Sequence, residues 1–60
     1  MAWLAVNKAG IEQIFELKPI RWSNYAWIPV WRTNAVAIPK GSTAKLIGRE
    51  LTWEDEPVEI

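Results

Sequence analysis

The chain has 60 residues, seven basic and seven acidic side chains, and no cysteine or histidine. This length allows one domain, residues 1–60, with a core so small that we expect the chain to form a homo-oligomer. The absence of cysteine excludes disulfides, and the absence of both cysteine and histidine leaves a zinc ion without its preferred ligands. The net charge of zero argues against binding to polymeric nucleic acid.

The first half of the chain predicts an N-terminal hairpin followed by a loop. Residues 2–6 are β-rich and lead into a turn closed by Gly10, and residues 11–17 alternate imperfectly as a second strand. A helix over the same residues is the competing interpretation. Pro19 ends the hairpin, and residues 19–26 predict a loop. The apolar start is too short for a signal sequence or a membrane span, and the lack of cysteine favours a reducing compartment, so we expect a cytoplasmic protein.

The second half predicts two more strands, a helix and a final strand. Residues 27–31 predict an extended edge strand, and residues 35–38 predict a further strand. Residues 43–47 predict a short helix, with Ser42 as its N-cap and Gly48 as its left-handed C-terminal residue. The fold class is therefore α+β: a small β-rich domain with an N-terminal hairpin, four to five short strands and one short helix at about 43–47.

Charge is unevenly distributed along the chain. Residues 17–49 carry six cations and no acid, whereas residues 50–60 carry five acids and no cation. The acidic segment could fold back on the basic middle or meet it across a subunit interface, or the basic window could serve a partner. These alternatives stay open.

The helix start offers a possible anion site. Lys40 precedes Gly41, whereas a phosphate loop needs the glycine before the lysine, so the order does not match that motif. The free N–H groups of residues 41–44, with Lys40 nearby, could still hold one phosphate or carboxylate. An ordinary helix cap is the simpler interpretation.

Aromatic side chains are concentrated in the middle of the chain. Five tryptophans in 60 residues is a marked excess, and Trp3 and Trp53 lie in segments that predict core positions. The middle aromatics are too many to bury in so small a domain, so they predict a ligand pocket, a subunit interface or both. The candidate ligand-binding residues are Arg21, Trp22, Tyr25, Trp27, Trp31, Arg32, Lys40, Ser42 and Thr43.

Two runs of the sequence resemble a known class of proteins. The run from Trp3 to Gly10 and the run from Ile38 to Val58 are similar to short accessory proteins encoded by phages and prophages. Proteins of this kind often inhibit host defence, either by blocking a nuclease or its guide complex, or by oligomerising and sequestering a nucleotide signal. The resemblance implies a counter-defence role for this chain.

These observations lead to three functional hypotheses, none of them enzymatic and none with a cofactor, metal or catalytic residue. In the first, a homo-oligomer sequesters a small anionic nucleotide-like ligand, with aromatic rings stacked on the base and Arg21, Arg32, Lys40 and the N–H groups near Ser42 on the phosphate. The alternative is a protein–protein inhibitor of a host defence factor, or a small interaction module, in which the same aromatics are hot spots. A clasp for proline-rich segments is the third.

Overall fold

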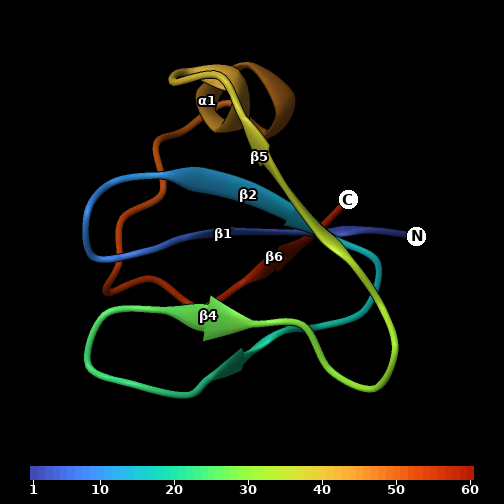
Figure 1. Ribbon diagram of the computed structural model, residues 1–60. Coiled ribbons are helices and arrows are strands. Elements are labelled where there is room, and N and C mark those ends of the chain that lie inside the picture. Colours follow the sequence, from blue (N-terminus) through green and yellow to red (C-terminus); the bar gives the residue numbers. More distant parts are fainter.

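The computed structural model describes all of residues 1–60 and contains six strands and one helix. Four strands form an antiparallel sheet in the order β5-β2-β1-β6, and β3 and β4 form a separate hairpin (Figure 1). The elements are β1 (Trp3–Val6), β2 (Glu12–Phe15), β3 (Ile20–Arg21), β4 (Trp27–Ile28), β5 (Ala35–Ile38), α1 (Ser42–Ile47) and β6 (Val58–Glu59). The predicted α+β class is confirmed, and the strand number exceeds the prediction because β3 lies in a segment expected to be a loop.

The N-terminal hairpin forms as predicted, and the helical alternative is wrong. β1 and β2 pair antiparallel with Leu4 opposite Ile14. Gly10 closes the turn at a φ of 88°, a left-handed conformation that glycine adopts without steric cost. The side chain of Asn7 stabilises the same turn, because its Oδ1 accepts a hydrogen bond from the Ile11 N–H at 2.9 Å.

One face of the sheet is covered by the C-terminal half of the chain. Leu4 and Val6 point to this face and form a buried cluster with Leu51. Ile47 of α1 and Val58 of β6 pack against the cluster. In Figure 1, α1 lies above the sheet on the far side from the β3–β4 hairpin.

The opposite face is covered by the β3–β4 hairpin. Ala5, Phe15 and Trp27 form a second buried cluster there, and Trp3 and Trp53 pack against it. The prediction that Trp3 and Trp53 belong to the core is confirmed. A four-stranded sheet in 60 residues is thus covered on both faces, by short segments in each case.

Two predictions for the middle of the chain are wrong. The loop expected over residues 19–26 includes β3, which forms because it pairs with β4. The strand expected over residues 27–31 is only two residues long, since the chain turns at Trp31, which has a φ of 61°. The turn is closed by a hydrogen bond from the Thr33 N–H to the Val30 carbonyl at 3.2 Å.

Helix α1 begins one residue earlier than predicted and ends as predicted. Gly41, at a φ of 93°, is its N-cap, so Ser42 is not the cap; the Ser42 hydroxyl instead donates to the Pro39 carbonyl at 2.6 Å. Gly48 adopts a φ of 78°, and its N–H donates to the Ala44 carbonyl at 2.9 Å. This bond satisfies one of the carbonyls that a helix end leaves free.

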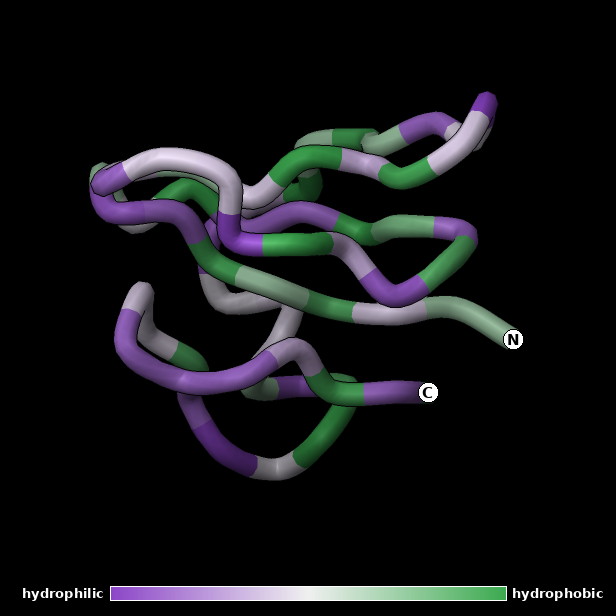
Figure 2. The backbone as a smooth tube through the Cα atoms, turned by 90° about the horizontal axis from the view of Figure 1, so that it is seen from below, coloured by the Kyte–Doolittle hydropathy of each residue, from purple (hydrophilic) through white to green (hydrophobic).

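The two ends of the chain lie side by side. Ala2 and Ile60 exchange backbone hydrogen bonds of 3.3 and 2.8 Å, and Figure 2 shows both ends on the same side of the molecule. No helix in the structure has the length and apolar character needed to cross a membrane.

Replacing Trp27 by phenylalanine should lower the free energy of unfolding by about 1–3 kcal/mol. The indole is 6% exposed and its Nε1 donates to the Val6 carbonyl at 3.0 Å, a bond that phenylalanine cannot make. Urea unfolding followed by circular dichroism measures the change. The exposed Trp22→Phe variant is the control and should stay within about 0.5 kcal/mol of the original protein; equal losses in both variants would contradict the assignment of Trp27 to the core.

Candidate functional site

The backbone donors at the start of α1 hold the carboxylate of Glu12. The Gly41 N–H donates to Glu12 Oε2 at 2.7 Å, and the Thr43 N–H donates to Glu12 Oε1 at 2.8 Å. Pairing of β2 with β5 makes this possible, because it sets Glu12 opposite Ile38, shortly before the helix. Short N–H···O⁻ bonds to a charged acceptor are stronger than neutral ones. The Gly41 and Thr43 donors predicted to hold an external anion are therefore occupied by a carboxylate of the chain itself.

The electrostatics of Glu12 agree with this role. The Gly41 N–H, and next the Thr43 N–H, lower the pKa of the Glu12 carboxyl from its usual value of 4.5, and nearby Lys40 lowers it further against the opposing effect of burial. The positive end of the helix dipole also favours a negative charge at this position. We call the contact between Glu12, Gly41 and Thr43 the Glu12 clamp. It ties β2 to α1.

The three predicted phosphate contacts near the helix are thus arranged differently from the prediction. Thr43 is buried, and its N–H is taken by Glu12. The Ser42 hydroxyl is bonded to a carbonyl of its own turn. Lys40 is exposed and remains available to solvent.

Arg21, a second predicted phosphate ligand, packs against two indole rings of the protein. Its Cζ lies 4.3 Å from the ring centroid of Trp27 and 4.1 Å from that of Trp53. The two rings make an edge contact, with centroids 5.7 Å apart and planes at 65°. A planar and weakly hydrated guanidinium suits such a position. We call Arg21, Trp27 and Trp53 the Arg21 cluster.

The hydrogen-bonding groups of Arg21 are also used within the chain. Nη1 donates to the Trp53 carbonyl at 2.8 Å, and Nη2 lies 3.9 Å from Glu56 Oε2. This ion pair is the one contact of its kind in the structure, and it joins the basic middle of the chain to the acidic end. Self-pairing of the two charged segments is therefore real, but it involves one pair.

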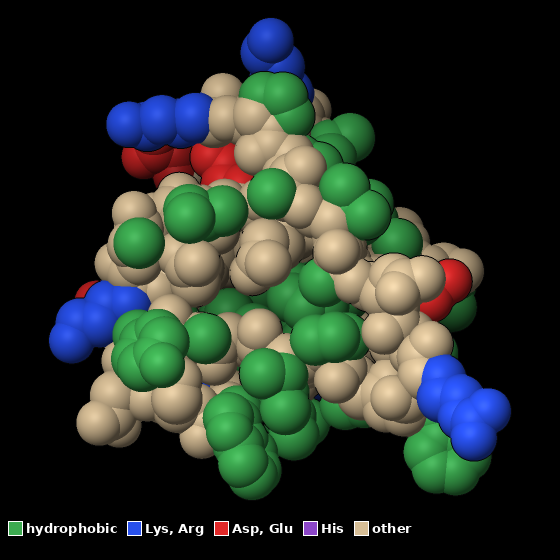
Figure 3. All heavy atoms as spheres, in the orientation of Figure 1, with side chains coloured by type: hydrophobic (Ala, Val, Ile, Leu, Met, Phe, Trp, Pro, Cys, Tyr) green, Lys and Arg blue, Asp and Glu red, His purple; other side chains and the backbone are tan.

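The remaining predicted aromatics point to solvent. Trp22 is 72% exposed, Tyr25 65% and Trp31 92%. Trp22 and Tyr25 come from the loop between β3 and β4, and Trp31 from the turn after β4. Trp31 and the exposed Arg32 line a hollow of about 390 Å³. Figure 3 shows apolar side chains reaching the surface over the lower part of the molecule, where the β3–β4 hairpin lies.

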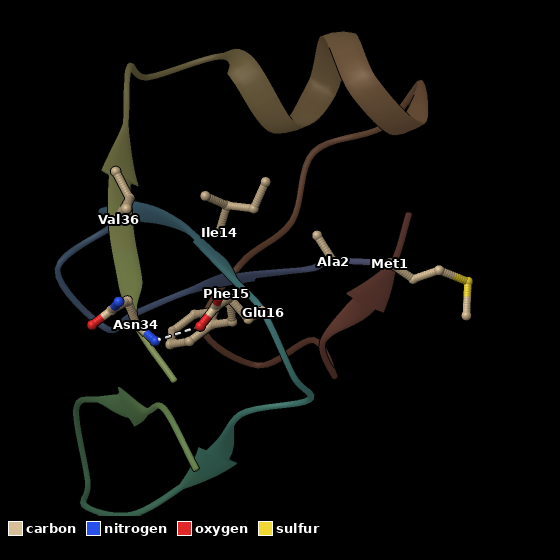
Figure 4. A pocket seen from close by; sticks show the side chains of 7 residues that line it. All are labelled: Met1, Ala2, Ile14, Phe15, Glu16, Asn34 and Val36. Carbon is tan, nitrogen blue, oxygen red and sulfur yellow. Dashed lines mark hydrogen bonds between the residues drawn. The ribbon is translucent and has the colours of Figure 1, made fainter. Parts of the chain in front are cut away.

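The largest hollow lies away from every predicted site residue. It measures about 500 Å³ and occupies the sheet surface near the start of the chain (Figure 4). At its rim the Asn34 N–H donates to Glu16 Oε2 at 3.0 Å, the bond drawn as a dashed line in Figure 4. Its lining residues are Met1, Ala2, Ile14, Phe15, Glu16, Asn34 and Val36.

Sequence reasoning missed the parts played by Glu12 and Trp53. The alternation of residues 11–17 put Glu12 on the solvent side of the hairpin, and only its register with β5 brings it to the helix. Trp53 was assigned to the core, but its contact with Arg21 joins residues 32 positions apart. No local pattern signals either contact.

Replacing Glu12 by glutamine should lower the free energy of unfolding at pH 7 by about 1–2 kcal/mol in a site partly screened by solvent. The amide has a single acceptor oxygen, so one of the two charge-assisted bonds becomes neutral and the other is lost. Because the pKa of Glu12 is lower in the folded than in the unfolded chain, its carboxylate stabilises the fold above the usual value of 4.5, and this contribution is lost as the pH falls through the folded value. Urea unfolding at a series of pH values would show a weaker acid dependence for the variant. Glu54→Gln, at an exposed position, is the control; a wild-type acid dependence in Glu12→Gln would contradict the clamp.

Replacing Arg21 by lysine should lower the free energy of unfolding by about 1–2 kcal/mol although the charge is kept, because the compact ammonium cannot contact both rings and also reach the Trp53 carbonyl as the guanidinium does. Tryptophan emission should shift to longer wavelength as Trp27 and Trp53 gain water. Arg32→Lys is the matched control and should change neither quantity. An unchanged stability of Arg21→Lys would show that the Arg21 cluster does not stabilise the fold.

Comparison of the chain with protein-family models, with curated proteins and with solved structures finds no match. The resemblance to phage accessory proteins therefore stays a prediction.

Proposed function

We propose that this protein is a non-enzymatic interaction module that docks onto another protein through the exposed aromatic set, which is Trp22, Tyr25 and Trp31. The other three tryptophans serve the fold, since Trp27 belongs to the buried cluster at the β3–β4 hairpin and the partly buried Trp3 and Trp53 pack against it. The exposed aromatic set takes no part in that core. Tryptophan and tyrosine are the residues most enriched among binding hot spots.

The observation that carries the proposal is the conformation of Trp31. Its ring is 92% exposed, and its φ of 61° lies in the left-handed region, at the second position of a tight turn. Glycine suits that position, whereas a bulky residue there costs on the order of 1–3 kcal/mol. A strained tryptophan that points into water adds nothing to the core. Contact with a partner gives such a ring a role.

Charge near the exposed aromatic set indicates the kind of partner surface. Arg32 follows Trp31 and shares its hollow, and it has no acidic partner within the chain. Arginine beside aromatic rings is typical of protein interfaces, where its guanidinium pairs with carboxylates at the rim. The partner surface we propose is apolar at its centre and acidic at its edge. The resemblance to phage accessory proteins supports a host defence factor as that partner.

The geometry favours this proposal over nucleotide sequestration. Stacking and phosphate binding would need Trp27, Arg21 and the helix-start donors together. Trp27 is buried, Arg21 lies in the Arg21 cluster, and the donors of Gly41 and Thr43 are bonded to the chain's own carboxylate. A nucleotide is left with the exposed rings, Arg32 and the exposed Lys40, without a phosphate cradle.

Replacing Trp31 by glycine should separate binding from stability. Glycine adopts a positive φ without strain, so the variant should unfold at the same temperature as the original protein or at a higher one. Loss of a hot-spot ring should weaken binding to the partner at least tenfold. Trp31→Phe keeps a ring and is the matched control. Quantitative affinity capture with the original protein, Trp31→Gly and Trp31→Phe would identify proteins whose recovery follows the ring, and titration of the purified partner would give the affinity.

Two outcomes would overturn the proposal. One is a partner that binds Trp31→Gly and Trp22→Ala as tightly as the original protein. The other is a shift of the unfolding temperature, and quenching of tryptophan emission, by cyclic or linear nucleotides in the absence of any ring-dependent protein partner. The second result would restore the sequestration hypothesis.

A further inference from the structure

The two edges of the four-stranded sheet differ in length and charge. β6 forms one edge, has two residues and carries the acidic side chain of Glu59. β5 forms the other edge, has four residues, and reads Ala-Val-Ala-Ile without a charge or a proline. Protein sheets usually protect their edges with charges, prolines, bulges or short strands. The β5 edge has no charge, proline or bulge along its four residues.

The hydrogen bonds of the hairpin determine which groups of β5 face outward. The Asn7 N–H donates to the Ile11 carbonyl, so these two residues form a hydrogen-bonded pair. In an antiparallel ladder such pairs alternate with non-bonded ones, so every second residue of β2 bonds to β1 and the others bond to β5. Ile14 belongs to the set that bonds to β5, where its partner is Val36.

The backbone groups of Ala35 and Ala37 are therefore turned away from the sheet. Val36 and Ile38 use their N–H and C=O groups toward β2, and the residues between them cannot. The direction of the Asn34 N–H agrees with this alternation, because it donates to the side chain of Glu16, the residue that follows β2. The free edge presents two N–H and two C=O groups with regular spacing.

We propose that β5 is a self-association edge, on which the β5 strand of a second copy of this chain pairs antiparallel. The pattern is self-complementary: with Val36 on the two-fold axis, Ala35 of one copy lies opposite Ala37 of the other, and the reverse. Each of these two pairs exchanges two hydrogen bonds, so four form in total. Two four-stranded sheets would join into one of eight strands.

Side chains on the sheet surface fit the same arrangement. Val36 is 59% exposed and would meet Val36 of the second copy across the non-bonded pair, where side chains approach most closely. Ile14 lies beside Val36 and lines the hollow of Figure 4 together with it. An apolar strip would thus continue from one copy into the other, and water would leave both strips.

Charges on the two sides of Val36 are complementary in this orientation. The hollow of Figure 4 has Glu16 at its rim, and a second hollow of about 360 Å³, lined in part by Ile14 and Ile38, has Lys45 at its rim. Antiparallel pairing places Asn34 of one copy opposite Ile38 of the other, which brings the first hollow next to the second. Glu16 of each copy then lies near Lys45 of the other, so the opposite charges meet twice. This complementarity favours a second copy as the occupant.

The contact is small, since it consists of a four-residue strand and a narrow apolar strip. It lies at the low end of interface sizes, so we expect a dimer that dissociates at a Kd on the order of micromolar to tens of micromolar. The self-association edge uses none of the residues of the exposed aromatic set. If the β5 edge does not self-associate, the proposed docking through the exposed aromatic set is unaffected. If the exposed aromatic set binds no partner, the self-association proposal is likewise unaffected.

Sedimentation equilibrium from about 10 µM to about 1 mM chain tests the pairing. The original protein should follow a monomer–dimer equilibrium, and Ala37→Pro should remain monomeric with an unchanged circular dichroism spectrum. Proline removes only an outward N–H there, which an edge strand tolerates. Ala37→Ser keeps the N–H and is the matched control that should still dimerise. Amide exchange of Ala35 and Ala37 should slow as the chain concentration rises.

Charge reversal tests the orientation. Glu16→Lys and Lys45→Glu should each weaken the dimer at least tenfold, and the double variant should recover most of the loss. Glu54→Lys, at an exposed position that lines neither hollow, should leave the equilibrium unchanged. The proposal is overturned if the original protein is monomeric at the highest concentration, if Ala37→Pro dimerises like the original protein, or if the double variant shows no recovery. A monomeric chain that binds a different protein at β5 would also overturn it.

Discussion

Covering both faces of a four-stranded sheet with only 60 residues is the constraint on which the rest of this structure depends. One six-residue helix and the segment around Leu51 cover one face, and a two-stranded hairpin covers the other. Each cover is too short to be stable by itself. Both are also held by polar side-chain contacts between distant parts of the chain, because there is little apolar surface to spare.

The Glu12 clamp and the Arg21 cluster are the two contacts that attach these covering segments to the rest of the chain. Glu12 satisfies N–H groups that the start of α1 leaves free and so attaches the helix to β2. Arg21 lies over two indole rings and donates a hydrogen bond to the Trp53 carbonyl, which attaches the hairpin to the C-terminal segment. The helix-start donors, the arginine and the tryptophans that suggest a ligand site in the sequence stabilise the fold here. The donors bind the Glu12 carboxylate, and the two indole rings contact the Arg21 guanidinium.

The side chains and backbone groups that take no part in these two contacts or in the core are available for binding. The exposed aromatic set lies on the hairpin layer and the turn that follows it, and the free edge of β5 borders the opposite face of the sheet. The two surfaces use different chemistry: large rings with an arginine in one, backbone donors and acceptors with small side chains in the other. A protein of this size could therefore engage a partner and a second copy of itself without competition between the two contacts.

The sequence by itself determined the local elements: the hairpin closed at Gly10, the strand over residues 35–38, and the helix that ends at Gly48. Each depends on patterns within a few residues, namely alternation, a glycine with positive φ, or a helix end. It also showed that the aromatics outnumber what the core can hold. Only the tertiary structure decided which rings and charges stay free. The register of β2 against β5 brings Glu12 to a donor 29 residues away, and packing of the hairpin brings Arg21 to a carbonyl 32 residues away, because such contacts depend on how whole elements meet.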